Sequence, residues 1–150
     1  MNQWVGADIE CYKGEIRKVL SPGEIHDVSR VPTVLVVDDE PLLRKLMRLA
    51  LEQGGFHVLT AENGRDAVSV SESHPGEIDL LVSDVMMPGM DGPTLAEELL
   101  HEDPNLPVLF VTGSSERLPL HKNERFPYIE KPFSTGTLVF TVRKMLNGRY

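Results

Sequence analysis

The sequence predicts an α/β domain of the doubly wound type, in which a parallel sheet lies between two layers of helices. Two observations support this fold class. From Val31 onward, short apolar runs that suit strands buried on both faces alternate with stretches whose apolar residues recur at helical spacing. Such alternation favours a parallel sheet, because each helix returns the chain to the edge where the next strand begins. A chain of five βα units commonly folds as the flavodoxin-like three-layer sandwich with strand order 2-1-3-4-5.

The five predicted strands are short and each ends at polar or turn-forming residues. They span Thr33–Val37, Phe56–Ala61, Ile78–Ser83, Pro107–Val111 and Phe126–Glu130.

Helices are predicted between the strands. The first begins at Pro41, since proline is tolerated in a first turn, and ends at Gly54-Gly55. The last begins after a capping Ser134 or Thr135. The apolar positions that mark the second, third and last helices are Ala67, Val68 and Val70, then Leu95, Leu99 and Leu100, then Leu138, Val139, Val142 and Leu146.

One helix of the pattern is weak or missing. The stretch from Gly113 to Pro127, GSSERLPLHKNERFP, lies where a fourth helix belongs, yet it shows no apolar stripe and has Pro119 in its middle. We expect a short helical turn or a loop there.

Residues 1–31 stand apart from the domain predicted for residues 32–150. They form either a tail or an extra element that packs on the domain or pairs two chains. Tyr12, Ile16, Val19 and Leu20 have the spacing of one face of a short helix, and Ser21-Pro22-Gly23 would end any element there.

Composition narrows the partners and the compartment. The chain has 150 residues and a formal net charge of −8, which argues against direct binding of nucleic acid. Cys11 is the single cysteine, and no apolar run approaches the roughly 20 residues that cross a bilayer. The N-terminal stretch does not resemble a signal peptide. We therefore expect a cytoplasmic protein without a membrane partner.

Acidic residues follow two strands that are neighbours in the predicted sheet. Asp38 and Asp39 follow the first strand, and Asp84 follows the third. The carboxyl ends of strands 1 and 3 meet at the switch point of the sheet, so these three side chains should lie close together. Their repulsion calls for a counter-charge. Mg²⁺, which takes oxygen ligands, and Lys131 at the end of the fifth strand are compatible candidates.

Four motifs at the strand ends resemble the receiver domain of two-component response regulators, of the chemotaxis-regulator type. They are VLVVDDEP, LLVSDVMMPGMDG, VLFVTG and YIEKPF, and they occur in order and in register over about residues 31–148.

The resemblance implies a role for each matching position. Asp84 would be the phosphoacceptor, receiving a phosphoryl group from a histidine kinase or a phosphotransfer protein. Asp39, Asp84 and the backbone carbonyl of Met86 would ligate Mg²⁺, and Asp38 would act mainly through a metal-bound water. The remaining implied roles are a hydroxyl donor to the phosphoryl group at Thr112, its cationic partner at Lys131, an aromatic switch at Tyr128 and a cis peptide bond before Pro132.

Such a domain would catalyse its own phosphorylation and dephosphorylation and act as a signalling protein rather than a turnover enzyme. It would be a stand-alone receiver or part of a hybrid sensor kinase. Leu42, Leu43 and Met47 on the first helix are candidates for docking the kinase if they are exposed.

Other interpretations remain open at this point. Asp38 and Asp39 could cap the next helix, where acids are favoured. The domain could dock a partner without turning over phosphate. A small hydrolase of the aspartyl-phosphate type would need an acid at residue 86, which is methionine, and a flavin carrier would need a phosphate loop where DDEP stands.

Overall fold

The computed structural model describes residues 9–12, 15–18, 30–113 and 126–148. The chain divides into two compact units, residues 1–31 and 32–150. The predicted loop or helical turn at 113–127 falls almost wholly outside the described residues.

The first unit contains an antiparallel pair of strands, β1 (Ile9–Tyr12) and β2 (Glu15–Lys18), with Cys11 opposite Ile16. The helix predicted across Tyr12 and Ile16 is therefore wrong. In the sequence, Gly14 lies inside that stretch, and glycine disfavours the interior of a helix.

The second unit is a five-stranded parallel sheet. Its strands are β3 (Thr33–Val37), β4 (His57–Ala61), β5 (Leu80–Asp84), β6 (Val108–Thr112) and β7 (Tyr128–Glu130). They lie in the order β4-β3-β5-β6-β7, all parallel. This is the predicted order 2-1-3-4-5, which confirms the fold class.

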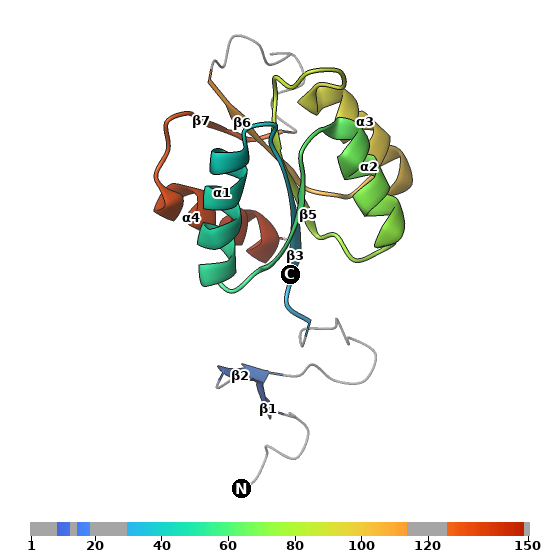
Figure 1. Ribbon diagram of the computed structural model, residues 1–150. Coiled ribbons are helices and arrows are strands. Elements are labelled where there is room, and N and C mark those ends of the chain that lie inside the picture. Colours follow the sequence, from blue (N-terminus) through green and yellow to red (C-terminus); the bar gives the residue numbers. More distant parts are fainter. Residues whose placement is uncertain (1–8, 13–14, 19–29, 114–125, 149–150) are drawn as a thin grey trace, which may run out of the picture. The chain divides into compact units, whose positions relative to one another are not determined.

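Among the residues that the structure describes, four helices cover the two faces of this sheet. They are α1 (Pro41–Gln53), α2 (Gly64–Ser73), α3 (Gly92–Glu102) and α4 (Thr135–Asn147). α1 and α4 lie on one face, and α2 and α3 on the other (Figure 1). Within the described ranges, no helix combines the length and the apolar character needed to span a bilayer.

Two hydrophobic cores hold the layers together, one on each face of the sheet. Successive side chains of a strand point to opposite faces, so β3 contributes to both. Val34 and Val36 pack with residues of α1 and α4, whereas Leu35 and Val37 pack with residues of α2 and α3. All four side chains are fully buried. The rigid sheet therefore fixes where its carboxyl edge presents the polar residues that follow each strand.

Candidate functional site

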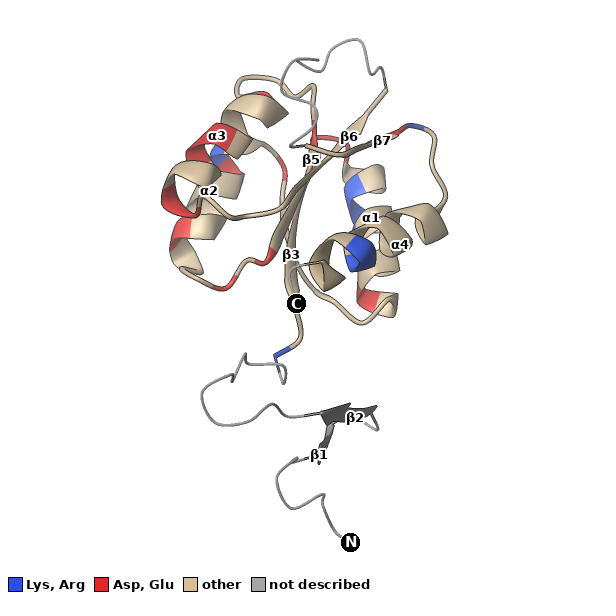
Figure 2. Cartoon of the chain, turned by 180° about the vertical axis from the view of Figure 1, so that it is seen from behind, with Lys and Arg blue, Asp and Glu red and all other residues tan. Residues whose placement is uncertain are grey.

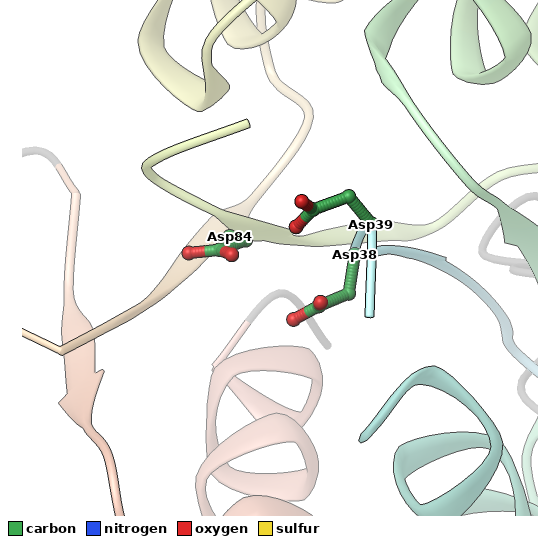
Figure 3. A group of neighbouring side chains, drawn as sticks. All are labelled: Asp38, Asp39 and Asp84. Atoms are coloured by element: carbon green, nitrogen blue, oxygen red, sulfur yellow. The ribbon is translucent and has the colours of Figure 1, made fainter. Parts of the chain in front are cut away.

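Three carboxylates meet at the carboxyl edge of the sheet. Asp38 and Asp39 follow β3, and Asp84 is the last residue of β5, the strand paired beside it. Ligand oxygens of the three side chains all lie within 4.8 Å of one another. Figure 3 shows them gathered in one place, although Asp84 reaches it from a different segment of the chain. Asp38 and Asp84 are buried, and Asp39 is exposed.

Lys131 supplies the positive charge at this site. Its Nζ lies 3.4 Å from Oδ2 of Asp38 and 3.3 Å from Oδ2 of Asp84. These distances are about 0.5 Å longer than the 2.7–2.9 Å that is typical of strong charged hydrogen bonds. One ammonium is thus shared between two carboxylates, and Asp39 makes no ion pair with it.

Backbone bonds bring Lys131 and Thr112 to the same edge. The N–H of Lys131 donates to the carbonyl of Thr112 at 2.8 Å. Thr112 is the last residue of β6 and is only 1% exposed. The peptide bond between Lys131 and Pro132 is cis.

The remaining residues implied by the resemblance lie around this edge. Met86 is 52% exposed, and its backbone N–H donates to Oδ1 of Asp84 at 3.3 Å. Tyr128, the first residue of β7, is 41% exposed. A hollow of about 450 Å³ opens beside Asp39, between the start of α2 and the loop that precedes α3.

The pKa values follow from burial and from this sharing of charge. Burial raises the pKa of the Asp84 carboxyl, and repulsion from Asp38 raises it further, while Lys131 opposes the shift only in part. Burial alone would lower the pKa of the Lys131 ammonium, but Asp38 and Asp84 outweigh burial and raise it. Lys131 therefore stays charged, and the site keeps more negative charge than the lysine can offset.

Sequence reasoning missed two contributors to the site. Nη1 of Arg44 donates to the backbone carbonyl of Asp38 at 2.8 Å. Gly92 packs so closely on the end of β5 that a Cβ there would overlap the carbonyl oxygen of Asp84. A signal for Arg44 was available, since it is a cation one turn into the helix that follows the acid pair. Gly92 ends the LLVSDVMMPGMDG motif, but the motif does not reveal its close contact with Asp84, because these residues become neighbours only in the folded chain.

The fold and the site define the class of protein as a doubly wound α/β domain that carries an acidic pocket, with a lysine beside it, at the switch point of its sheet. The family model described as the response regulator receiver domain matches residues 34–143. The chain belongs to this family and contains a receiver domain of two-component systems.

Two relatives of the chain are proteins of the bacterium Brucella abortus. The chain is 41% identical over 123 residues to the sensor kinase CckA of Brucella abortus, a match that covers 80% of this chain but 13% of CckA. It is 33% identical to the response regulator receiver protein CpdR of Brucella abortus, covering 75% of this chain and 95% of CpdR.

A solved structure of a response regulator is also similar to this chain. The chain is 33% identical to the response regulator TrrA of Thermotoga maritima, whose structure is a complex with Mg²⁺ and BeF. The match has a TM-score of 0.69 and covers 77% of this chain and all of TrrA. Acidic pockets of this family typically bind Mg²⁺, and the acidic pocket described above is of that kind.

Proposed function

We propose that Asp84 accepts a phosphoryl group from a phosphohistidine of a histidine kinase or a phosphotransfer protein. The observation that carries the proposal is the convergence of Asp38, Asp39 and Asp84 around a single lysine, Lys131. A carboxylate oxygen of Asp84 attacks phosphorus, the bond from phosphorus to the donor's imidazole nitrogen breaks, and its electron pair leaves with that nitrogen. The product is an acyl phosphate on Asp84.

The three carboxylates fit a small divalent cation. Mg²⁺ binds oxygen at about 2.1 Å, so ligands on opposite sides of the ion are about 4.2 Å apart. Oxygens that lie within 4.8 Å of one another need only a small adjustment to reach that spacing. The ligands we propose are Asp39, Asp84 and the backbone carbonyl of Met86, with Asp38 acting through a water. When bound, Mg²⁺ supplies the positive charge that offsets repulsion between the carboxylates and the incoming phosphoryl group.

Lys131 and Thr112 would stabilise the phosphoryl group after transfer. The lysine has a long flexible stem, so its Nζ can leave the shared position between Asp38 and Asp84 and pair with a phosphoryl oxygen. The Thr112 hydroxyl can donate a hydrogen bond at the same edge. Movement of Thr112 toward the phosphoryl group would free space for the ring of Tyr128, which is half-exposed at present, and so change a surface for protein contacts.

The docking surface for the phosphoryl donor is proposed on α1. Leu42, Leu46 and Leu49 are 77%, 47% and 41% exposed and recur at positions i, i+4 and i+7 on one side of the helix. Leu42 meets the condition of exposure under which it was named as a candidate docking residue. Met47 does not meet it, because its side chain is fully buried. Leu43 is half-buried.

The charged residues of α1 and α4 favour an acidic partner for this face of the domain. α1 carries three basic residues and one acid, and α4 carries two basic residues and no acid. In Figure 2 the basic residues of the described helices gather mainly on α1 and α4, while most charged residues of α2 and α3 are acidic. A donor with an apolar patch bordered by acids would match both features of α1. We further propose a cytoplasmic location, which the single cysteine supports.

The test is phosphorylation of the chain by acetyl phosphate with Mg²⁺, followed by intact mass. We expect the mass of one phosphoryl group to be added to the wild type and none to Asp84→Asn. Asp91→Asn is the matched control, because Asp91 is an exposed acid that caps α3 and asparagine caps a helix equally well. A wild type that gains no mass would instead favour a docking module that does not turn over phosphate. An Asp84→Asn variant that gains the mass would refute Asp84 as the phosphoacceptor, because another residue would then carry the phosphoryl group.

A further inference from the structure

Every polar group of Asp38 is engaged by a different neighbour. Its backbone N–H donates to the carbonyl of Ala61 at 3.3 Å. Its Oδ1 accepts from the N–H of Glu40 at 2.8 Å, and its Oδ2 faces Lys131. Its backbone carbonyl accepts from Nη1 of Arg44 at 2.8 Å. Because Asp38 has no exposed surface, these bonds set its orientation.

The bond from Arg44 is unusual in its choice of acceptor. Arg44 is half-buried on the first turn of α1, close to an acidic cluster that would be expected to attract a guanidinium. Within the described part of the chain, however, it makes no ion pair with a carboxylate within 4.0 Å and binds the backbone carbonyl of Asp38 instead.

The same bond fixes the start of α1. Glu40 is the N-cap residue of this helix, and its side chain makes no capping hydrogen bond. The backbone N–H of Arg44 donates to the carbonyl of Glu40 at 3.0 Å, and its guanidinium reaches back to residue 38. Arg44 thus holds the segment from Asp38 to Glu40 from the helix side, while β3 holds it from the sheet side.

We propose that Arg44 is a positioning residue for the cation site. It holds the backbone of Asp38 so that the carboxylates of Asp38 and Asp39 face Asp84. This inference rests on the proposed function in one respect, namely that the acidic pocket binds a divalent cation. Arg44 itself contacts neither the cation nor the phosphoryl group.

Positioning and charge predict opposite effects when Arg44 is removed. A positive charge near a cation site repels the cation, so neutralising the charge alone would strengthen Mg²⁺ binding. Loss of a residue that orients the ligands weakens metal binding, typically about tenfold to a hundredfold. The direction of the change in affinity therefore identifies the role.

The experiment compares Arg44→Gln with Lys45→Gln in the full chain. Lys45 is the next residue on α1 and is exposed. Among the described residues it makes no hydrogen bond to residues 38–40, so its replacement removes the same charge without removing the bond to the carbonyl of Asp38. Isothermal titration calorimetry with MgCl₂ at fixed ionic strength gives the dissociation constant. We expect about tenfold weaker binding by Arg44→Gln, and binding by Lys45→Gln that is unchanged or slightly tighter.

Three results would overturn the proposal. One is Mg²⁺ binding by Arg44→Gln that is as tight as in the wild type or tighter. Another is an equal loss of affinity in Lys45→Gln. The third is a lower urea midpoint for Arg44→Gln with an unchanged dissociation constant for the folded protein, since that describes a residue needed for stability alone. A wild type that binds no Mg²⁺ would refute the cation site of the proposed function itself, which is a separate outcome.

Discussion

Replacing Gly92 with alanine tests whether the close contact between α3 and β5 positions the proposed phosphoacceptor. Gly92 is the first residue of α3, and its N–H donates to the carbonyl of Val85 at 2.9 Å. A Cβ on Gly92 would overlap the carbonyl oxygen of Asp84 and lie 3.0 Å from Cα of Val85. Both neighbours are backbone atoms, so the added methyl group can be accommodated only if α3 or the end of β5 moves.

The size of the effect follows from two opposing contributions. Forcing an extra methyl group into a packed site costs about 1–3 kcal/mol. Alanine recovers up to about 1 kcal/mol relative to glycine in a helix, because it has less backbone freedom to lose. With the full gain subtracted, the expected net loss in the free energy of unfolding is about 0–2 kcal/mol. Movement of the Asp84 backbone should also slow phosphorylation, since it shifts the carboxylate relative to Asp38, Asp39 and Lys131.

Gly136→Ala is the control for this variant. Gly136 is the second residue of α4, and the nearest atom to a Cβ there is Oγ of Ser134 at 3.9 Å. This substitution should be neutral or stabilise the protein by about 0.4–1 kcal/mol. Urea unfolding measures both stabilities, and acetyl phosphate labelling measures the rate. If Gly92→Ala were as stable and as rapidly phosphorylated as Gly136→Ala, the close contact would not constrain the site and the reasoning would fail.

Three further predictions concern charge and packing. Burial, followed by repulsion from Asp38, raises the pKa of Asp84 in the native state, so its ionisation opposes folding once the pH exceeds the usual carboxyl range. Asp84→Asn without metal should thus be more stable than the wild type in urea at about pH 7, with the gain shrinking toward about pH 3–4; a gain that did not depend on pH would contradict this. Lys131→Met leaves two buried carboxylates facing each other and should lose about 1–3 kcal/mol in metal-free buffer, and Mg²⁺ should raise its melting temperature more than that of the wild type. An equal response to Mg²⁺ would show that Lys131 does not compete for these carboxylates. Leu81→Ala empties a fully buried position of β5 and should cost about 2–5 kcal/mol by urea unfolding, and a smaller loss would mean that the sheet relaxes around the cavity.

The arrangement of the sheet was predictable from the sequence because each buried strand is an uninterrupted apolar run. Thr33–Val37 was predicted with its observed bounds. The third strand was predicted to begin at Ile78, but it begins at Leu80. The reason is Asp79, whose Oδ2 accepts a hydrogen bond from the backbone N–H of Thr33 at 2.8 Å. A side chain that bonds the neighbouring strand cannot be distinguished in sequence from a polar residue within a strand.

The gathering of the three acids was predictable too, since parallel strands place their carboxyl ends at one edge. The sequence did not predict correctly which side chains of a helix face solvent. Met47 and Leu46 are adjacent on α1, yet one is fully buried and the other is 47% exposed. Neighbouring residues point about 100° apart around a helix of 3.6 residues per turn, so a small error in the assumed buried face exchanges their roles. The contact of Arg44 with Asp38 also depends on how the helix is rotated.

The charge of the acidic pocket explains why its ligands would arrive together. Folding places Asp38 and Asp84 around one ammonium, at distances of 3.4 and 3.3 Å, and leaves Asp39 exposed beside them. The raised pKa of Asp84 shows that Lys131 does not offset the cost of burial and repulsion. A phosphoryl group alone would add negative charge to a site already rich in it. A small divalent cation bound to the same oxygens would reverse that balance, and Lys131 would then be free to pair with the phosphoryl oxygens. Under the proposed function, the cation would therefore relieve the repulsion among these carboxylates and so allow the negatively charged phosphoryl group to enter, and the new contacts of that group would supply the free energy to move Thr112 and the surface around it.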